Sequence, residues 1–309
     1  MSVGLCCQFL KSRTKRDGTT IYENIIEEKS LQLGQYKAGK YSEERIRDTY
    51  RHNVDEHLKI ISTLVADNIH SFRISSSLLP LFEFAGDIAR NDQILLRKFH
   101  LLGELFRKHD IRVTTHPGQF TVLSSDRDVV VQNSIRELEY HAWMFDMMGL
   151  SQTAHNAINI HGGKADRSER LIDVIKTLPA NVRNRLTLEN DEKCYNVKQL
   201  LQIHEKCGVP VVLDSHHYNF NSNDLIYDDA YFATVSTWGQ IKPLQHLSNT
   251  EPGMENGSFN EKRSHSNFIH YVNQHQLDAL RANTIDVDIE AKMKNIALLK
   301  FREEYGIVV

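Results

Sequence analysis

The sequence lacks the features that would place the protein in a membrane or outside the cell. No apolar run approaches the roughly 18 residues that a membrane-spanning helix needs. The N-terminus also lacks the ordered charged, apolar and small-residue regions of a signal peptide. Cysteine is scarce, and the four present are too few for a disulfide-stabilised secreted scaffold. We therefore expect a cytoplasmic protein with no membrane partner.

A strong charge of one sign is missing as well. The net charge is −3 over 309 residues, which gives no support for an overall basic nucleic-acid binder. Any contact with phosphate groups must then come from a local patch or from bound cations. Apolar residues make up 40% of the chain and charged residues 25%, so a packed core is expected. No linker, repeat or low-complexity segment interrupts the chain, and we expect one domain over residues 1–309.

Short β-rich segments alternate with helix-like stretches along the chain. Several β-rich segments are continuous apolar runs, as expected for parallel strands covered on both faces. Ser42 is placed to cap a helix that begins at Glu43 and carries an apolar stripe to Val65. The other expected helices cover 93–109, 127–148, 167–178, 196–206, 224–236 and 292–304. The expected strands are Val3–Phe9, Ser71–Ser75, Arg112–Thr115, Ala157–His161, Leu186–Glu189, Pro210–Asp214, Ile241–Ser248 and Thr284–Glu290.

This alternation predicts an α/β fold, a single-domain (β/α)8 TIM barrel. The alternative is an open, doubly wound sheet with a small extra domain. We favour the barrel because no glycine-rich phosphate loop follows any of the expected strands. Two long connections, 10–41 and 249–264, would lie at the C-terminal rim, where barrel enzymes build their active sites.

Histidines and carboxylates stand at the C-terminal ends of six consecutive strands. One such histidine is more often a hydrogen-bonded structural residue than a ligand, and one such carboxylate can be an ordinary ion-pair partner. A whole rim of them instead predicts a polynuclear metal site, with a donor set that suits Zn²⁺, Mn²⁺ or Fe²⁺ better than Mg²⁺ or Ca²⁺. The residues are His116, His161, Glu189, Asp214, His217 and its neighbour His216, His246 and Glu290, with His265 in the loop after the seventh strand.

Clustered divalent cations favour one reaction above others. They activate a water and neutralise the attacking and leaving oxygens of a phosphoryl group, so phosphodiester hydrolysis is the leading chemistry. The alternative for a metal-bearing barrel is aldose–ketose isomerisation, in which two metals hold sugar oxygens. A metal-binding module without catalysis is less favoured, because the ligands stand at the catalytic rim.

Several short motifs, taken in order, resemble the UV damage endonucleases, relatives of the endonuclease IV-type abasic-site nucleases. The resemblance implies a (β/α)8 barrel that cuts damaged double-stranded DNA on the 5′ side of a photolesion with bound metals, often manganese. Abasic-site cleavage is the nearest alternative. The motifs span nearly the whole chain: Phe72–Ser76, His116–Phe120, Asn159–Gly163, Glu189–Asp191, Asp214–His217, His246–Ser248, His265–Ser266 and Ile289–Lys292.

The resemblance also assigns the ligands of two or three cations. His116, His161 and Glu189 resemble the ligands of one metal. A second set shares the bridging Glu189 and adds Asp214, His246 and Glu290. His217 and His265 resemble part of a third site, and His216 receives no role. The catalytic carboxylates implied by the resemblance are Glu189, Asp214 and Glu290.

Two departures from the family pattern concern the third metal and the recognition of damage. Leu244 stands where the family tends to have a lysine two residues before the seventh-strand histidine, so the third site loses a supporting group, with Lys242 as one possible substitute. Gln119 and Phe120 resemble a Gln–Tyr pair that probes the duplex, although Phe120 could equally be core. Leu5, in the first strand, is expected to probe the lesion where relatives commonly have a tyrosine.

One basic cluster is expected to contact the DNA backbone, unless it is simply a solvated loop. It lies in the first long connection, at the rim, where side chains can reach phosphates. Arg73 and Lys292 are further candidates, although Arg73 could instead pair with a carboxylate. The cluster contains Lys11, Arg13, Lys15 and Arg16. We expect the protein to act as a monomer.

Overall fold

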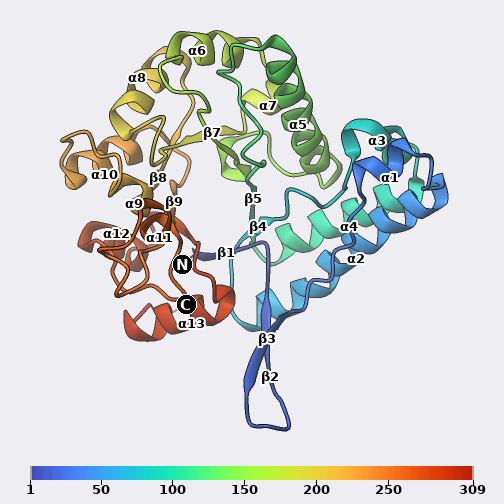
Figure 1. The fold of residues 1–309 in the computed structure, drawn as a ribbon, viewed down its shortest axis with the longest axis horizontal. Coiled ribbons are helices and arrows are strands. Elements are labelled where there is room, and N and C mark those ends of the chain that lie inside the picture. The colour runs from blue at the N-terminus through green and yellow to red at the C-terminus, as the bar shows by residue number, and fades with distance from the viewer. Residues whose placement is uncertain (1, 308–309) are drawn as a thin grey trace.

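The computed structural model describes residues 2–307, which form a closed barrel of parallel strands (Figure 1). Strand β1 pairs with both β10 and β4, which closes the sheet and excludes the open, doubly wound alternative. The predicted (β/α)8 barrel is confirmed. Its strands, in chain order, are β1 (Ser2–Cys6), β4 (Ser71–Ile74), β5 (Arg112–Thr115), β6 (Ile158–His161), β7 (Leu186–Glu189), β8 (Val211–Asp214), β9 (Leu244–Leu247) and β10 (Asp286–Ile289).

Helices surround the barrel as a ring (Figure 1). The longest, α2, begins as predicted, because the Ser42 side chain accepts a hydrogen bond from the Arg45 backbone N–H. Most of the predicted apolar stripe is buried, but Val65 at its end is 37% exposed. The ends of the other six predicted helices lie within three residues of their predicted positions, whereas α3 (Phe82–Arg90) and α12 (Gln274–Arg281) were not predicted. The predicted helices are α2 (Glu43–Ala66), α4 (Gln93–Lys108), α5 (Asp128–Met147), α6 (Ser168–Thr177), α8 (Val197–Cys207), α10 (Tyr227–Ser236) and α13 (Lys294–Glu304).

The structure adds elements where the sequence predicted only loops. The first long connection contains an antiparallel hairpin, β2 (Leu10–Thr14) with β3 (Thr20–Asn24), which is a separate sheet that projects from the body of the protein (Figure 1). These strands are polar and exposed, so no alternating apolar pattern marked them. The remaining short helices are α1 (Leu33–Lys37), η1 (Ala154–Asn156), α7 (Ala180–Arg183), α9 (Ser215–Tyr218) and α11 (Phe259–Arg263).

The inside of the barrel is polar below its C-terminal rim. Asp288 on β10 is buried and accepts hydrogen bonds from the hydroxyls of Ser71 on β4 and Thr114 on β5. Neither strand neighbours β10, so both bonds run across the inside of the barrel. Since side chains alternate along a strand, Glu290 points to the same side as Asp288, two residues further toward the rim. The predicted metal ligands therefore stand on a hydrogen-bonded polar layer.

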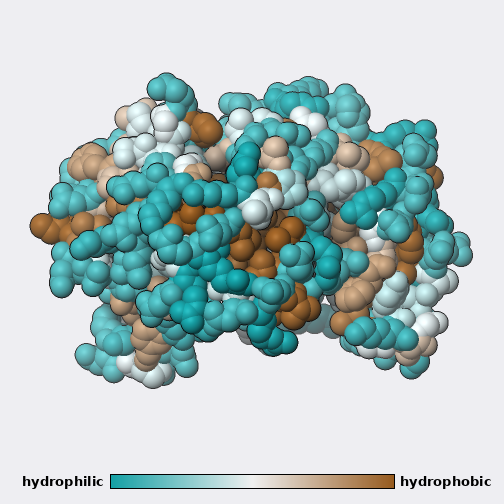
Figure 2. Space-filling view, turned by 90° about the horizontal axis from the view of Figure 1, so that it is seen from above, coloured by the Kyte–Doolittle hydropathy of each residue, from teal (hydrophilic) through white to brown (hydrophobic). Residues whose placement is uncertain are grey.

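The apolar core lies outside this layer, between the strands and the surrounding helices. Leu5, Phe72 and Ile74 are fully buried there together with apolar residues of α2 and α4. The face in Figure 2 is mostly hydrophilic, with hydrophobic groups in small interrupted areas. Among residues 2–307, no helix is long and apolar enough to cross a bilayer.

Gly4 provides the first prediction, because β1 passes directly beside Asp288. A Cβ at Gly4 would lie 1.9 Å from Asp288 Oδ1 and 2.8 Å from Ser71 Oγ. We expect Gly4→Ala to displace the buried carboxylate and to lower the free energy of unfolding by about 1–3 kcal/mol, the usual range for overpacking. Urea denaturation measures this. Gly34→Ala is the matched control, since nothing lies within 4 Å of a Cβ there. Equal stability of Gly4→Ala and the parent would contradict the argument.

Candidate metal centre and DNA-binding rim

The ends of the strands bring the predicted ligands together. Their ligand atoms form three groups, each within 4.8 Å: His116, His161 and Glu189; Glu189, Asp214 and His217; Asp214, His246 and Glu290. Strand register explains part of this, because His161 lies opposite Glu189 and Asp214 lies opposite His246. The groups overlap through Glu189 and Asp214, so they form one continuous cluster.

Glu189 occupies the centre of the cluster. Its Oε2 lies 3.0 Å from His116 Nε2, and its Oε1 lies 3.1 Å from His246 Nδ1 and 3.4 Å from His217 Nδ1. Only 1% of the residue is exposed, and the Asn159 amide donates a hydrogen bond to Oε2. A carboxylate so deeply buried requires opposite charge close by.

The charges of the cluster depend strongly on one another. Burial favours a raised pKa for Glu189, but His246 and His161 outweigh it and hold that pKa well below its usual range. Burial likewise opposes protonation of the histidines, yet Asp214 and Glu189 raise the pKa of His217 to about 11. Glu189 and Glu290 raise the pKa of His246 to about 9. Carboxylate charge thus attracts protons to the positions where cations would bind.

The donor atoms fit divalent cations. His116 Nδ1 lies 3.1 Å from the Pro117 carbonyl. When Nδ1–H donates to that carbonyl, Nε2 presents a lone pair toward Glu189, as in a metal-ligating histidine. Several other buried ligand atoms have no hydrogen-bond partner among residues 2–307, which costs free energy unless an ion binds to them. These atoms are His161 Nδ1, Glu189 Oε1, Asp214 Oδ2, both ring nitrogens of His246 and His265 Nδ1.

Asp214 has two roles that its two oxygens divide. Its Oδ1 accepts a hydrogen bond from the His217 backbone N–H at 2.7 Å, which caps α9. Its Oδ2 is buried and has no partner. The same carboxylate therefore holds the turn that carries His217 and presents a free oxygen to the cluster.

The outer histidines differ from one another in position. His217 lies among the inner ligands, whereas His265 Nδ1 lies 3.7 Å from Glu290 Oε2 at the edge of the cluster. Their ring centroids are 6.4 Å apart. His216, which the sequence left without a role, has Nε2 3.1 Å from the Arg263 carbonyl. It therefore fixes the backbone just before His265.

Leu244 lies below the cluster on the side of β9 that also carries His246. It is fully buried and packs with Val212 and Trp238, among other apolar residues. Lys242 does not replace the lysine of the family pattern, because its Nζ lies 2.6 Å from Asp286 Oδ1 toward the other end of the strand. The lysine of the family pattern is therefore absent at position 244, and Lys242 does not take its place beside His246.

The predicted probing residues have different positions. Gln119 and Phe120 follow His116 and Pro117 in the loop after β5, and Phe120 is 65% exposed, which excludes a place in the core. The expectation for Leu5 is wrong: Leu5 is fully buried in the core. Side chains alternate along β1, and the residue before it, Gly4, faces Asp288 inside the barrel. Leu5 consequently points outward, under the helices.

Two of the residues predicted to contact the DNA backbone, Arg73 and Lys292, also differ in their surroundings. Arg73 bonds to Glu290, so it is an ion-pair partner of a ligand, the alternative noted from the sequence. Lys292 and Lys294 line a cavity of about 250 Å³ with Arg73, His265 and Glu290. Neither lysine forms an ion pair within residues 2–307. Sequence reasoning missed Lys294, although its place two residues beyond Lys292 was a signal.

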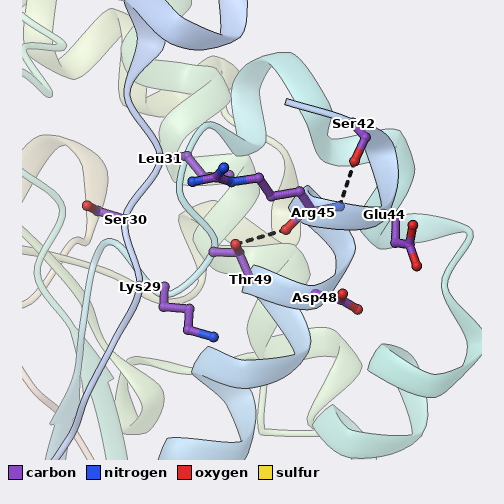
Figure 3. Close-up of a pocket in the computed structure, with 8 residues that line it drawn as sticks. All are labelled: Lys29, Ser30, Leu31, Ser42, Glu44, Arg45, Asp48 and Thr49. Carbon is purple, nitrogen blue, oxygen red and sulfur yellow. Dashed lines mark hydrogen bonds between the residues drawn. The ribbon is translucent and has the colours of Figure 1, made fainter. Parts of the chain in front are cut away.

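A larger cavity, of about 550 Å³, lies away from the cluster at the start of α2 (Figure 3). Ser42 and Thr49 line it, and both bond to the backbone of Arg45: Ser42 accepts from its N–H and Thr49 donates to its carbonyl. No predicted metal ligand reaches this cavity. This cavity is thus separate from the candidate site.

Comparisons with known proteins agree with this geometry. Residues 18–307 match the family described as UV-endonuclease UvdE. A UV DNA damage endonuclease of Nostoc sp. (strain PCC 7120) is 35% identical over 267 residues, which cover 84% of this chain and 80% of the relative. One from Bacillus cereus (strain Q1) is 31% identical over 283 residues, or 86% and 84% of the two chains.

Solved structures give the same result. The crystal structure of SacUVDE matches with a TM-score of 0.80 and 28% identity over 100% of both chains. An L-ribulose 3-epimerase structure matches with a TM-score of 0.52 and 14% identity over 80% of this chain and 81% of that one, which shows only a shared barrel fold. On its sequence and its fold, the chain belongs to the UV-endonuclease UvdE family.

Proposed function

We propose that this protein is a metal-dependent endonuclease that hydrolyses a phosphodiester bond of UV-damaged double-stranded DNA on the 5′ side of the lesion. The observation that carries the proposal is the set of three overlapping ligand groups around buried Glu189 at the barrel rim. Relatives named as UV DNA damage endonucleases support the choice of substrate.

The residues of the cluster would hold two or three divalent cations, which we propose to be Mn²⁺, with Zn²⁺ or Fe²⁺ also suited to this donor set. Bound cations supply an activated water and neutralise the oxygens of the reacting phosphate. Glu189 and Asp214 each belong to two neighbouring ligand groups, so they would link the cation sites to one another. Arg73 orients Glu290 through their ion pair. Since Leu244 is apolar and Lys242 pairs with Asp286 instead, we propose that any third cation is held more weakly than the other two.

Recognition of damage is assigned to the loop after β5. Phe120 is four residues from His116, so an exposed ring and a metal ligand share one short segment. Such a ring stabilises unstacked DNA, and a lesion lowers the cost of unstacking because its bases stack poorly. Gln119 would contact the bases beside the ring. Lys292 would approach the DNA backbone from the opposite side of the cluster, next to Glu290.

We further propose that the protein acts as a monomer in the cytoplasm, at the nucleoid. One chain supplies every ligand of the cluster, which supports activity without a second subunit.

An incision assay tests the proposed function. One end-labelled duplex is presented intact, UV-irradiated or with a single abasic site, in Mn²⁺, Mg²⁺ or chelator. We expect metal-dependent nicking on the 5′ side of photolesions and no cutting of the intact duplex. Cutting at abasic sites alone would show that the substrate is abasic DNA and not UV-damaged DNA. No cutting of any duplex would refute the proposal.

Glu189→Gln tests the centre of the cluster, because it keeps the shape of the side chain and removes the charge. We expect loss of bound metal and a decrease in incision rate of at least about 100-fold, the upper range for losing an outer-shell partner of a metal ligand. Metal analysis and single-turnover incision measure both. Glu104→Gln, at an exposed position of α4, is the control. Normal metal content and a parental rate in Glu189→Gln would show that the cluster is assigned wrongly.

Phe120→Ala separates recognition from chemistry. The ring is not a ligand, so metal content should not change, while binding to a lesion duplex should weaken by about 1–3 kcal/mol, the range for one base–aromatic stack. Fluorescence anisotropy with lesion and intact duplexes measures the change. Phe232→Ala, which removes an exposed ring from α10, should bind as the parent does. The wedge assignment fails if Phe120→Ala and the parent bind lesion DNA equally.

A further inference from the structure

We propose that the β2–β3 hairpin is a second DNA-binding element, which contacts the backbone of the intact duplex beside the lesion. The inference rests on the proposed function and adds to it a surface outside the metal cluster. Its partner is double-stranded nucleic acid, recognised by charge and shape and not by base sequence.

The hairpin is an ordered projection with little of its own to pack against. Its strands pair from Leu10 with Asn24 to Thr14 with Thr20, and residues 11–20 are all exposed. The tip is a defined turn: Gly18 has a φ of +84°, and the Lys15 N–H donates to the Thr19 carbonyl at 2.8 Å. An isolated two-stranded ribbon is only marginally stable in water. A role in contacting a partner would explain why the protein keeps this hairpin.

The charge of the hairpin is opposite to that of the chain as a whole. Four cations stand on it in a protein of net charge −3. Its two acidic residues are already engaged: Glu23 pairs with Arg13 at 2.9 Å, and Asp17 accepts from the Thr19 N–H within the turn. The other three cations form no ion pair within residues 2–307. They are Lys11, Lys15 and Arg16.

The shape of the ribbon suits a DNA groove. The major groove is about 12 Å wide and admits a two-stranded β-ribbon. Lys11 and Arg13 share one face of the hairpin because side chains alternate. Ser12, Thr14, Thr20 and Tyr22 lie on the other face, where their hydroxyl groups can bond to phosphate oxygens.

The root of the hairpin is fixed close to the metal cluster. Leu10 donates its N–H to Asn295 Oδ1 at 2.6 Å and accepts at its carbonyl from Asn295 Nδ2 at 3.0 Å. Asn295 is only 4% exposed and lies just beyond Lys292 and Lys294, in the segment that leads from Glu290. The root of the hairpin is therefore fixed to α13, which begins four residues after Glu290.

The length of the hairpin indicates which part of the DNA it reaches. Five residues separate Leu10 from Lys15, which is about 17 Å of extended strand. A ribbon laid along the helix axis would, at about 3.4 Å of rise for each base pair, reach about five base pairs beyond its root. In this orientation the contact would fall on flanking duplex and not on the lesion.

The test combines a charge reversal at the tip with duplexes of unequal arms. Lys15→Glu/Arg16→Glu is compared with Lys108→Glu/Arg183→Glu, an equal charge change at exposed positions that precede β5 and β7, at the opposite end of the barrel. Two lesion duplexes are used: one extends about 12 base pairs on the 5′ side of the lesion and about three on the 3′ side, and the other has the two arms exchanged. Each protein, loaded with Mn²⁺, is titrated with both duplexes over a range of salt concentrations.

We expect the tip variant to bind one of the two duplexes about tenfold more weakly than the parent does and to bind the other with parental affinity. For the affected duplex, the slope of log affinity against log salt concentration should decrease in magnitude by about two. The control variant should bind both as the parent does. Incision by the tip variant at saturating DNA should keep the parental rate, since the metal cluster is unchanged. Parental affinity of the tip variant for both duplexes overturns the inference. Failure of the parent to cut any lesion duplex refutes the proposed function instead.

Discussion

The cluster depends on one constraint, which is that a carboxylate buried as deeply as Glu189 must have positive charge beside it. Histidine protons or cations can supply that charge, and the same pocket accommodates either. The polar layer below the cluster, built around Asp288, also favours buried charge, because it places hydrogen-bond donors where an ordinary barrel has branched apolar side chains. The absent side chain of Gly4 makes room for that layer.

Much of the site was predictable because the barrel topology maps chain order onto space. His161, Glu189 and Asp214 each end a strand and His116 directly follows one. Parallel strands that close into a barrel must present those ends at one rim. Their grouping was not predictable from position alone. Whether His217 faces Glu189 or joins His265 depends on the turn of α9, which the Asp214 side chain sets.

The errors have equally physical causes. Leu5 was expected to probe the lesion from its place in the family pattern, but a shift of one residue along a strand reverses the direction of a side chain, and only register settles it. The hairpin was missed because two polar strands that pair only with each other leave no apolar alternation in the sequence. Phe120 was ambiguous for the opposite reason: an apolar residue is placed in the core by default, and only its exposure in the structure shows otherwise.

The divided role of Asp214 has a consequence for how the site can be dissected by mutation. One oxygen caps the first turn of α9 and so fixes the backbone that carries His217, while the other faces the cluster. A substitution at this position therefore disturbs two things at once, the turn that orients a neighbouring histidine and an oxygen of the cluster itself. The geometry of the rim and its capacity for cations are thus tied to a single carboxylate.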